Sequence, residues 1–261
     1  MVRIYGEKPI SICVIHGGPG AHGSMAPVAR ELSGYPGVLE PMQSGHSIEA
    51  LMKELRSQVS EHAVAPVTLI GHSWGAWISY LFAAQFPGTV NKIILVAGGP
   101  FTSKYARTLD KTRLSRLSSA EQKEFQELIR QLALPSPDEV KHMSRLEEIL
   151  LKSDSFSPSY ADMNKHDSLP PDPRSFRALW HEGEQLRRSG ALLSYGSSIE
   201  CPVIGIHGDY DPHPAAGVRK PLEKVLRDFR FHLLERCGHY PWFEEHARDR
   251  FFTLIRNELE E

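Results

Sequence analysis

Apolar residues along this chain fall into two alternating patterns, short continuous runs and helical repeats. Continuous runs rich in Ile, Val and Leu are typical of strands buried in a parallel sheet; they occupy residues 10–15, 67–70, 92–97, 201–207 and 229–234, with a weaker run at 37–41. Apolar positions at helical spacing lie between or after them, at residues 24–32, 47–62, 74–86, 221–226 and 242–259. This alternation predicts an α/β fold with a mostly parallel sheet and helices on both faces.

One long stretch departs from the alternation. Residues 101–199 contain no convincing strand, and their helix starts are explicit: Ser118 and Glu121 form a capping box, and Asp172 precedes Pro173. We therefore expect an α/β core made of residues 1–100 and 200–261, interrupted by an all-helical cap at residues 101–199.

The turn at residues 71–75 (GHSWG) joins a buried strand to a helix that begins at Trp74. Such a sharp turn strains its central residue, and the strain is tolerated where the neighbours lack a Cβ atom. The pattern is the G-x-S-x-G nucleophile elbow, which makes Ser73 a candidate nucleophile. The motif is short, and serine is also an ordinary helix cap. The role of Ser73 as nucleophile therefore depends on whether other segments supply a base, an acid and an oxyanion hole.

Two later loops supply an acid and a base. In a parallel sheet, ligands bind outside the carboxyl ends of the strands. Asp209 and Asp211 follow one strand and His239 follows the last. An imidazole can take the serine proton, and a carboxylate orients that imidazole. We predict a Ser73, Asp211, His239 triad and assign Asp209 to the turn backbone, a choice that rests on position.

Residues 16–20 (HGGPG) follow the first buried strand and offer little besides backbone. A tetrahedral intermediate needs hydrogen-bond donors arranged around its developing negative charge. We predict that the backbone N–H groups of Gly18 and Trp74 form this oxyanion hole, because Pro19 has no N–H to give.

Four motifs together resemble the α/β-hydrolase superfamily: residues 16–20 (HGGPG), 71–75 (GHSWG), 208–211 (GDYD) and 238–239 (GH). The HGGPG form is similar to the proline iminopeptidase-like group. The resemblance implies an α/β-hydrolase fold with a helical cap. Aminopeptidases of that group bind the substrate amine with acids from the cap and beside the catalytic Asp. Here Pro212 follows Asp211 and no cap segment resembles the group's glutamate motif, so we expect small esters or thioesters, with amide hydrolysis as the alternative.

Four cap residues are candidates for substrate binding. Phe156, Tyr160 and Trp180 are aromatic residues that can line the site, and Glu182, like Glu184 on the same predicted helix, can replace the missing amine-binding acid. Packing within the cap and a solvated helix face explain the same residues.

The composition limits the classes of binding partner that we expect for this protein. The formal net charge of −2, with no polybasic stretch, predicts neither a nucleic-acid nor a membrane partner, and no apolar run is long enough to span a bilayer. Three cysteines form no disulfide framework, and the first residues show no signal peptide, so a cytoplasmic protein acting on a small molecule is expected. The oligomeric state stays open.

Some residues also fit other classes of function. Residues 18–23 match G-x-G-x-x-G, and with Glu40 they suggest an NAD-dependent oxidoreductase. That hypothesis gives no role to the elbow or to the loops that carry Asp211 and His239. His207, Asp209, Asp211 and His213 suggest a metal site, but one crowded loop rarely gives a tetrahedron. A non-catalytic, ligand-binding relative is a third alternative. We expect no metal and no cofactor.

Overall fold

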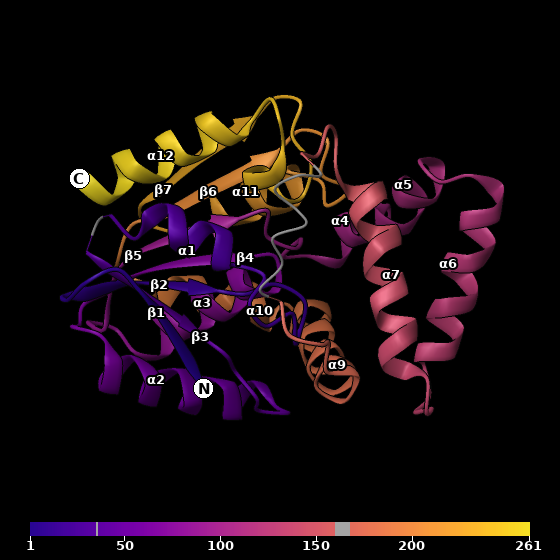
Figure 1. Cartoon of the computed structure of the whole chain (residues 1–261). Coiled ribbons are helices and arrows are strands. Elements are labelled where there is room, and N and C mark those ends of the chain that lie inside the picture. The colour runs from indigo at the N-terminus through magenta and orange to yellow at the C-terminus, as the bar shows by residue number, and fades with distance from the viewer. Residues whose placement is uncertain (35, 160–167) are drawn as a thin grey trace.

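A seven-stranded sheet forms the centre of the computed structural model, which describes residues 1–34, 36–159 and 168–261 (Figure 1). The order is β1-β3-β2-β4-β5-β6-β7, and β1 alone pairs antiparallel. The strands are β1 (Val2–Tyr5), β2 (Ile10–Ile15), β3 (Gly37–Pro41), β4 (Val67–His72), β5 (Val90–Val96), β6 (Val203–Gly208) and β7 (Phe229–Leu234). The predicted α/β-hydrolase fold is confirmed.

Helices cover both faces of the sheet. They are α1 (Ala26–Leu32) and α12 (Arg248–Glu260) on one face and α2 (Ile48–His62), α3 (Trp74–Gln85) and α11 (Ala216–Leu222) on the other. Successive strand residues point to opposite faces. In β5, Ile93 and Leu95 accordingly belong to the cluster of α2 and α3, whereas Ile94 and Val96 belong to that of α1 and α12. This two-sided burial explains why the strand sequences are continuously apolar.

Two helix boundaries differ from the sequence prediction. Helix α11 spans Ala216–Leu222 rather than residues 221–226, and α12 begins at Arg248 rather than at residue 242. Trp242 and Phe243 are buried and lie in the 3-10 turn η2 (Pro241–Phe243). Their apolar side chains fit a helical period in the sequence, but they fill the core ahead of the helix.

Helices lie between β5 and β6. They are α4 (Ser103–Ala106), α5 (Leu109–Ser115), α6 (Ser119–Leu132), α7 (Glu139–Asp154), α9 (Pro173–Ser189) and α10 (Ala191–Ser194), followed by the 3-10 turn η1 (Tyr195–Ser198). We call residues 101–199 the helical insertion. Helices α6 and α7 form a pair that projects from the sheet and has its own apolar cluster, whereas α9 lies nearer the core (Figure 1). The capping box of Ser118 and Glu121 is present, and the Asp172 side chain caps α9.

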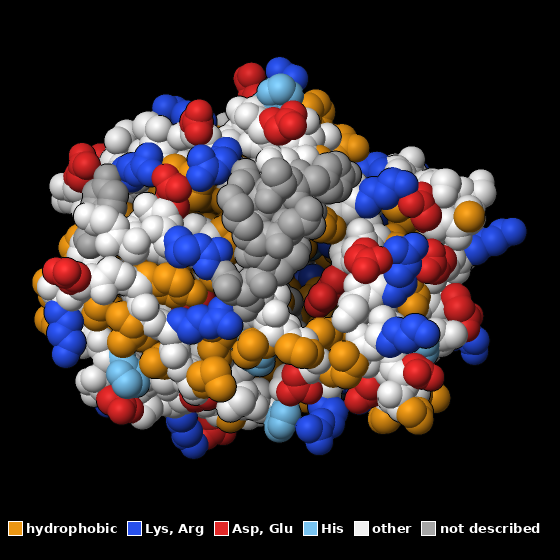
Figure 2. Space-filling view, viewed as in Figure 1, with side chains coloured by type: hydrophobic (Ala, Val, Ile, Leu, Met, Phe, Trp, Pro, Cys, Tyr) orange, Lys and Arg blue, Asp and Glu red, His pale blue; other side chains and the backbone are white. Residues whose placement is uncertain are grey.

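The described surface carries mixed charge. Lys and Arg side chains are interspersed with Asp and Glu side chains over the visible face, on the core and on α6 and α7 alike (Figure 2). Across the part of the chain that the structure describes, no helix is both long and apolar enough to cross a bilayer.

Candidate active site

Ser73 occupies the turn between β4 and α3 in a strained backbone conformation, with φ +53° and ψ −111°. Its backbone N–H donates to the carbonyl of Val96 at 2.9 Å. The flanking glycines are required by close packing: a Cβ atom on Gly71 would lie 2.2 Å from the carbonyl oxygen of Gly75, and one on Gly75 would lie 2.3 Å from that of Ile15. The sequence therefore folds here into the predicted elbow.

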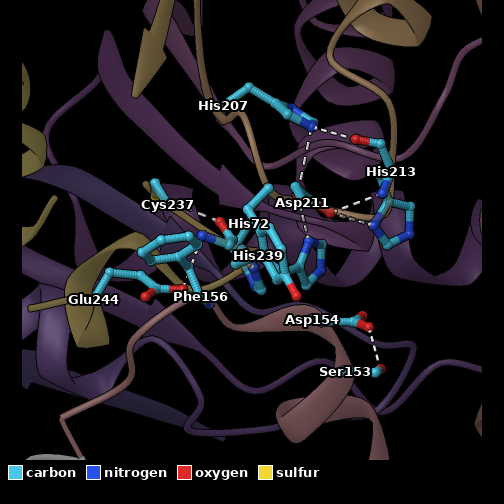
Figure 3. A network of polar contacts seen from close by, with 12 residues as sticks. His72, Ser153, Asp154, Phe156, His207, Asp211, His213, Cys237, His239 and Glu244 are labelled. Carbon is cyan, nitrogen blue, oxygen red and sulfur yellow. Dashed lines mark hydrogen bonds and ion pairs between the residues drawn. The ribbon is translucent and has the colours of Figure 1, made fainter. Parts of the chain in front are cut away.

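Asp211 and His239 meet beside the carboxyl ends of β6 and β7. The Nδ1 atom of His239 donates to Oδ2 of Asp211 at 2.8 Å, and both residues are buried (Figure 3). Burial is the largest influence on the pKa of the Asp211 carboxyl and raises it, but the imidazoles of His239, His213 and His207 together hold that pKa well below its usual range. Asp211 is therefore an ionised partner for the imidazole.

His72 connects the base loop to the elbow. Its Nε2 atom donates to the backbone carbonyl of His239 at 2.9 Å, and the two ring centroids are 4.7 Å apart. Burial is the main reason why the pKa of His72 lies well below its usual value, so the ring is a neutral donor. Because His72 directly precedes Ser73, this bond places His239 beside the elbow. No sequence motif assigns a role to His72.

A second imidazole shares the carboxylate of Asp211. The backbone N–H and Nδ1 of His213 both donate to Oδ1 at 2.9 Å, and the His213 ring stacks on His239 with centroids 4.5 Å apart. Burial lowers the pKa of His213 to about 4, so it is neutral at pH 7. His207 in turn donates to the His213 carbonyl at 2.7 Å. His213 thus holds one carboxylate oxygen of Asp211, Oδ1, while His239 binds the other, Oδ2.

The residues considered as metal ligands form a hydrogen-bonded cluster. Candidate ligand atoms of Asp211, His213 and His239 lie within 4.8 Å of one another. Both imidazoles, however, use Nδ1 as a donor to the carboxylate. Asp209 is occupied elsewhere: its Oδ1 accepts the backbone N–H of Cys237 at 3.2 Å. These hydrogen bonds account for the cluster of Asp211, His213 and His239, and Asp209 binds the backbone of the loop after β7 rather than that of its own turn.

The HGGPG loop packs directly on the elbow. A Cβ atom on Gly17 would lie 2.7 Å from Nδ1 of His72 and 3.4 Å from Cβ of Ser73. The next residue, Gly18, has φ +71°. Trp74 is the first residue of α3, where backbone N–H groups have no partner within the helix. The structure therefore brings the segments that carry both predicted oxyanion donors to Ser73.

A small cavity of about 20 Å³ opens onto the elbow, room for about one water molecule. It is lined by Ser73, Trp74, Trp77, Gly99, Pro100, Leu109, Trp180, Arg187 and His213. Aromatic and aliphatic groups dominate this lining, as in most sites for small organic molecules. Among the predicted substrate-binding residues, Trp180 belongs to it.

The other predicted substrate-binding residues do not line this cavity. The Phe156 ring packs edge-on against Tyr210, with centroids 5.3 Å apart. Oε2 of Glu182 accepts the backbone N–H of Ile48, the first residue of α2, at 2.7 Å. A helix N-terminus attracts a carboxylate because its first N–H groups are unpaired, and this corrects the expected placement of Glu182. Tyr160 lies outside the described residues.

Contacts between the insertion and the His239 loop were not foreseen from the sequence. The carboxylate of Glu244 is fully buried and accepts the backbone N–H groups of Gly238 and Phe156 at 2.8 Å and of Ser157 at 2.7 Å (Figure 3). The carbonyl of Asp154 accepts the N–H of His239 at 2.7 Å. Gly238 lies six residues before Glu244, but the other partners are 85 to 88 residues apart in the chain, so no local sequence pattern predicts those contacts.

Two arginines of α5 and the turn after it extend this connection. Arg113 is bound to the buried carboxylate of Asp154, with one N–O distance of 2.6 Å. Arg116 donates to the carbonyls of Ser153 at 2.8 Å and Tyr210 at 2.7 Å, and it lies 3.6 Å from the Tyr210 ring centroid. The loop that carries Asp211 is therefore also anchored to the insertion.

A family model described as the alpha/beta hydrolase family matches residues 14–254. The chain belongs to this family. Its fold is similar to that of an alpha/beta fold family hydrolase from Bacillus anthracis (TM-score 0.75, 15% identity, 98% of this chain and 94% of the other). It is also similar to proline iminopeptidase from Mycobacterium smegmatis (TM-score 0.62, 14% identity, 99% and 93%), which agrees with the predicted resemblance.

Sequence relatives match a shorter region. The uncharacterized protein Rv2715 of Mycobacterium tuberculosis is 32% identical over 111 residues, which are 38% of this chain and 32% of that protein. The chain thus spans about a third of the length of the curated relatives it matches.

Family membership argues against the dinucleotide hypothesis. The glycines of residues 18–23 lie within the matched hydrolase region. Glu40, the residue considered for a ribose, is fully buried on β3 and accepts the Tyr5 hydroxyl at 2.7 Å.

Proposed function

We propose that this α/β-hydrolase-family protein is a serine hydrolase that cleaves small carboxylic esters or thioesters through an acyl-enzyme. The observation that carries the proposal is the connection of three segments: Ser73 strained at the elbow, His239 tied to the neighbouring His72, and Asp211 bound to the Nδ1 atom of His239. These residues have the chemistry that acyl transfer needs, and the bond between His72 and His239 supports their placement near one another.

The bond from Nδ1 of His239 to Asp211 leaves Nε2 free of the proton, as a general base requires. Nε2 takes the Ser73 proton while the serine oxygen attacks the substrate carbonyl. The N–H groups of Gly18 and Trp74 bind the resulting oxyanion. Collapse expels the alcohol or thiol, which receives the proton from His239. A water molecule, deprotonated by the same imidazole, then attacks the acyl-enzyme; the bond from the acyl carbon to the Ser73 oxygen breaks, this oxygen takes the proton back from His239, and the acid is released.

His213 is the natural rival for the role of base, because it also binds Asp211 and lines the cavity. Its bonds to Asp211 are local, however, since the two residues are two positions apart in one loop. His239 comes from another strand and is held by the neighbour of Ser73. We therefore assign His239 as the base and His213 as a positioning residue that fixes the acid.

The cavity lining also bears on the choice between esters and peptides. Recognition of a free amine calls for a carboxylate, and the described residues that line the cavity include no Asp or Glu. Of the predicted substitutes, Glu182 binds the start of α2, and Glu184 is paired with Arg187 and Arg188. We therefore propose esters or thioesters, with aminopeptidase activity as the alternative to be tested because of the fold shared with a proline iminopeptidase.

The test is labelling with a fluorophosphonate, followed by assays on p-nitrophenyl esters and on amino-acid amides. We expect the intact protein to be labelled and the Ser73→Ala variant to be inert. His239→Asn should lose nearly all turnover, whereas His213→Asn should retain more. Absence of labelling would refute the serine mechanism and favour a ligand-binding relative. A larger loss in His213→Asn would reassign the base, and cleavage that needs a free amine would establish the peptidase.

A further inference from the structure

Arg187 is a buried cation in the wall of the cavity that contains Ser73. It lies in the last turn of α9, and its residue surface is only 8% exposed. The same cavity is lined by Ser73 and Trp180. The Nε atom of Arg187 has no hydrogen-bond partner among the described residues, although it is shielded from solvent. Buried guanidinium groups normally have all their N–H donors paired, so this atom calls for an explanation.

The charge of Arg187 is only partly balanced by its neighbours. Glu184 lies one turn earlier on α9, at 3.5 Å from the guanidinium. That carboxylate is closer to Arg188, at 3.1 Å, so the two arginines share one anion. The face of the Trp77 ring lies 5.5 Å from the Arg187 guanidinium carbon and adds a cation–π contact. Burial is the largest influence on the pKa of Arg187 and lowers it. A second anion would stabilise this group.

The surrounding wall strengthens any interaction with that charge. Helix α9 presents Trp180, Gly183 and Arg187 on one face, at intervals of three and four residues. A Cβ atom on Gly183 would lie 2.5 Å from the ring of Trp74, so the helix packs directly on the indole. Electrostatic interactions are stronger in such a largely apolar setting than in solvent.

We propose that Arg187 binds a carboxylate of the substrate, so that the preferred substrates are short esters or thioesters that carry a second, ionised carboxyl group. The inference rests on the proposed function, because it takes Ser73 as the reacting group. A guanidinium pairs with a carboxylate through two parallel hydrogen bonds, and the unpaired Nε is one of the donors that such a pair uses. The substrate carboxylate then supplies the balancing negative charge that Glu184, which also pairs with Arg188, provides only in part.

A carboxylate fits the site better than a phosphate. Among the described residues that line the cavity, Arg187 is the only Lys or Arg, and His213 is neutral at pH 7 because burial lowers its pKa to about 4. One guanidinium matches the single charge of a carboxylate, whereas a phosphate dianion needs further donors. Phosphorylated esters are therefore an outcome of the test rather than the expectation.

The kinetic test compares methyl hydrogen succinate, glutarate and adipate with the matching methyl ester carboxamides, which have the same shape and no charge. Acid release is followed in a pH-stat. We expect kcat/KM to be at least 10-fold higher for one of the carboxylates than for its carboxamide, through a lower KM. In Arg187→Gln that ratio should fall 10- to 100-fold, the usual worth of a charged hydrogen bond. Arg187→Lys should recover part of it. Arg188→Gln, which removes an exposed neighbour with the same partner, should keep the ratio.

A binding measurement separates failure of this inference from failure of the proposed function. Monomethyl glutarate is titrated calorimetrically into Ser73→Ala, with Arg187→Gln added in the same background. Binding that needs Arg187 supports the inference even if fluorophosphonate labelling fails. Equal binding of ester acid and carboxamide, or an unchanged ratio in folded Arg187→Gln, would overturn it. Preference for O-phosphoryl esters over the carboxylates would also overturn it in the form stated.

Discussion

The buried carboxylate of Glu244 offers a sharp test of how the insertion holds the His239 loop. Its two oxygens accept three backbone N–H groups, from Gly238, Phe156 and Ser157. In Glu244→Gln, whichever way the amide turns, at least one of these N–H donors faces an NH2 group. The variant loses one charge-assisted bond, about 1.5–3 kcal/mol, and leaves a buried donor unpaired, about 1–3 kcal/mol more. We therefore expect a loss of about 3–5 kcal/mol in the free energy of unfolding.

Thermal melts and urea titrations followed by circular dichroism measure this loss, which corresponds to a lowering of Tm by about 6–20 °C for a chain of this size. The hydrolysis rate should fall as well, because Gly238 precedes His239. Glu245→Gln is the matched control: its exposed carboxylate accepts only the Ser157 hydroxyl, at 2.8 Å, among the described contacts, and its removal should cost less than about 0.5 kcal/mol. If both variants unfold at the same urea concentration as the parent, the buried carboxylate does not anchor the loop.

Three further predictions follow from the same geometry. Asp211→Asn should lower kcat by about 10⁴-fold, because an amide favours the wrong tautomer of the base, whereas Asp209→Asn should lower it far less; equal losses in a steady-state assay would contradict the assignment. Gly75→Ala should fail to give soluble folded protein, since its Cβ would lie 2.3 Å from a carbonyl of β2, whereas Gly34→Ala meets nothing within 4 Å and should fold normally. Burial lowers the pKa of His16 from 6.5 to about 4, so the unfolded chain binds the extra proton first as the pH falls, and stability is lost below pH 6.5. In urea titrations, this histidine should account for about 2 kcal/mol of the free energy of unfolding that is lost between pH 7 and pH 5. If His16→Asn shows the same pH dependence of stability as the parent, His16 does not make this contribution.

Much of the core could be predicted because its signals are local. A strand buried on both faces has to be continuously apolar, and β2, β4 and β5 were recognised on that basis. The elbow was recognised because a strained turn needs its two glycines at fixed spacing, at Gly71 and Gly75. The last helix was placed too early because Trp242 and Phe243 fit a helical period while packing in the core.

The candidate site was predicted as far as chain order allowed. Three strand ends supply Ser73, Asp211 and His239, and parallel strands bring their carboxyl ends to one edge. Nothing in the sequence ranked His72 or His213, because the role of each depends on a partner in space: a carbonyl 167 residues away for His72, and the shared carboxylate for His213.

The sequence by itself determined the order of elements, the glycine-flanked turn and the types of reacting groups, since these depend on short-range sterics and on the alternation of buried faces. Only the tertiary structure decided which side chains line the cavity. Trp180 and Arg187 face Ser73, whereas Glu182, on the same helix, turns to the start of α2. The physical reason is that the orientation of α9 depends on the close packing of Gly183 against Trp74. This contact joins segments about a hundred residues apart in the chain.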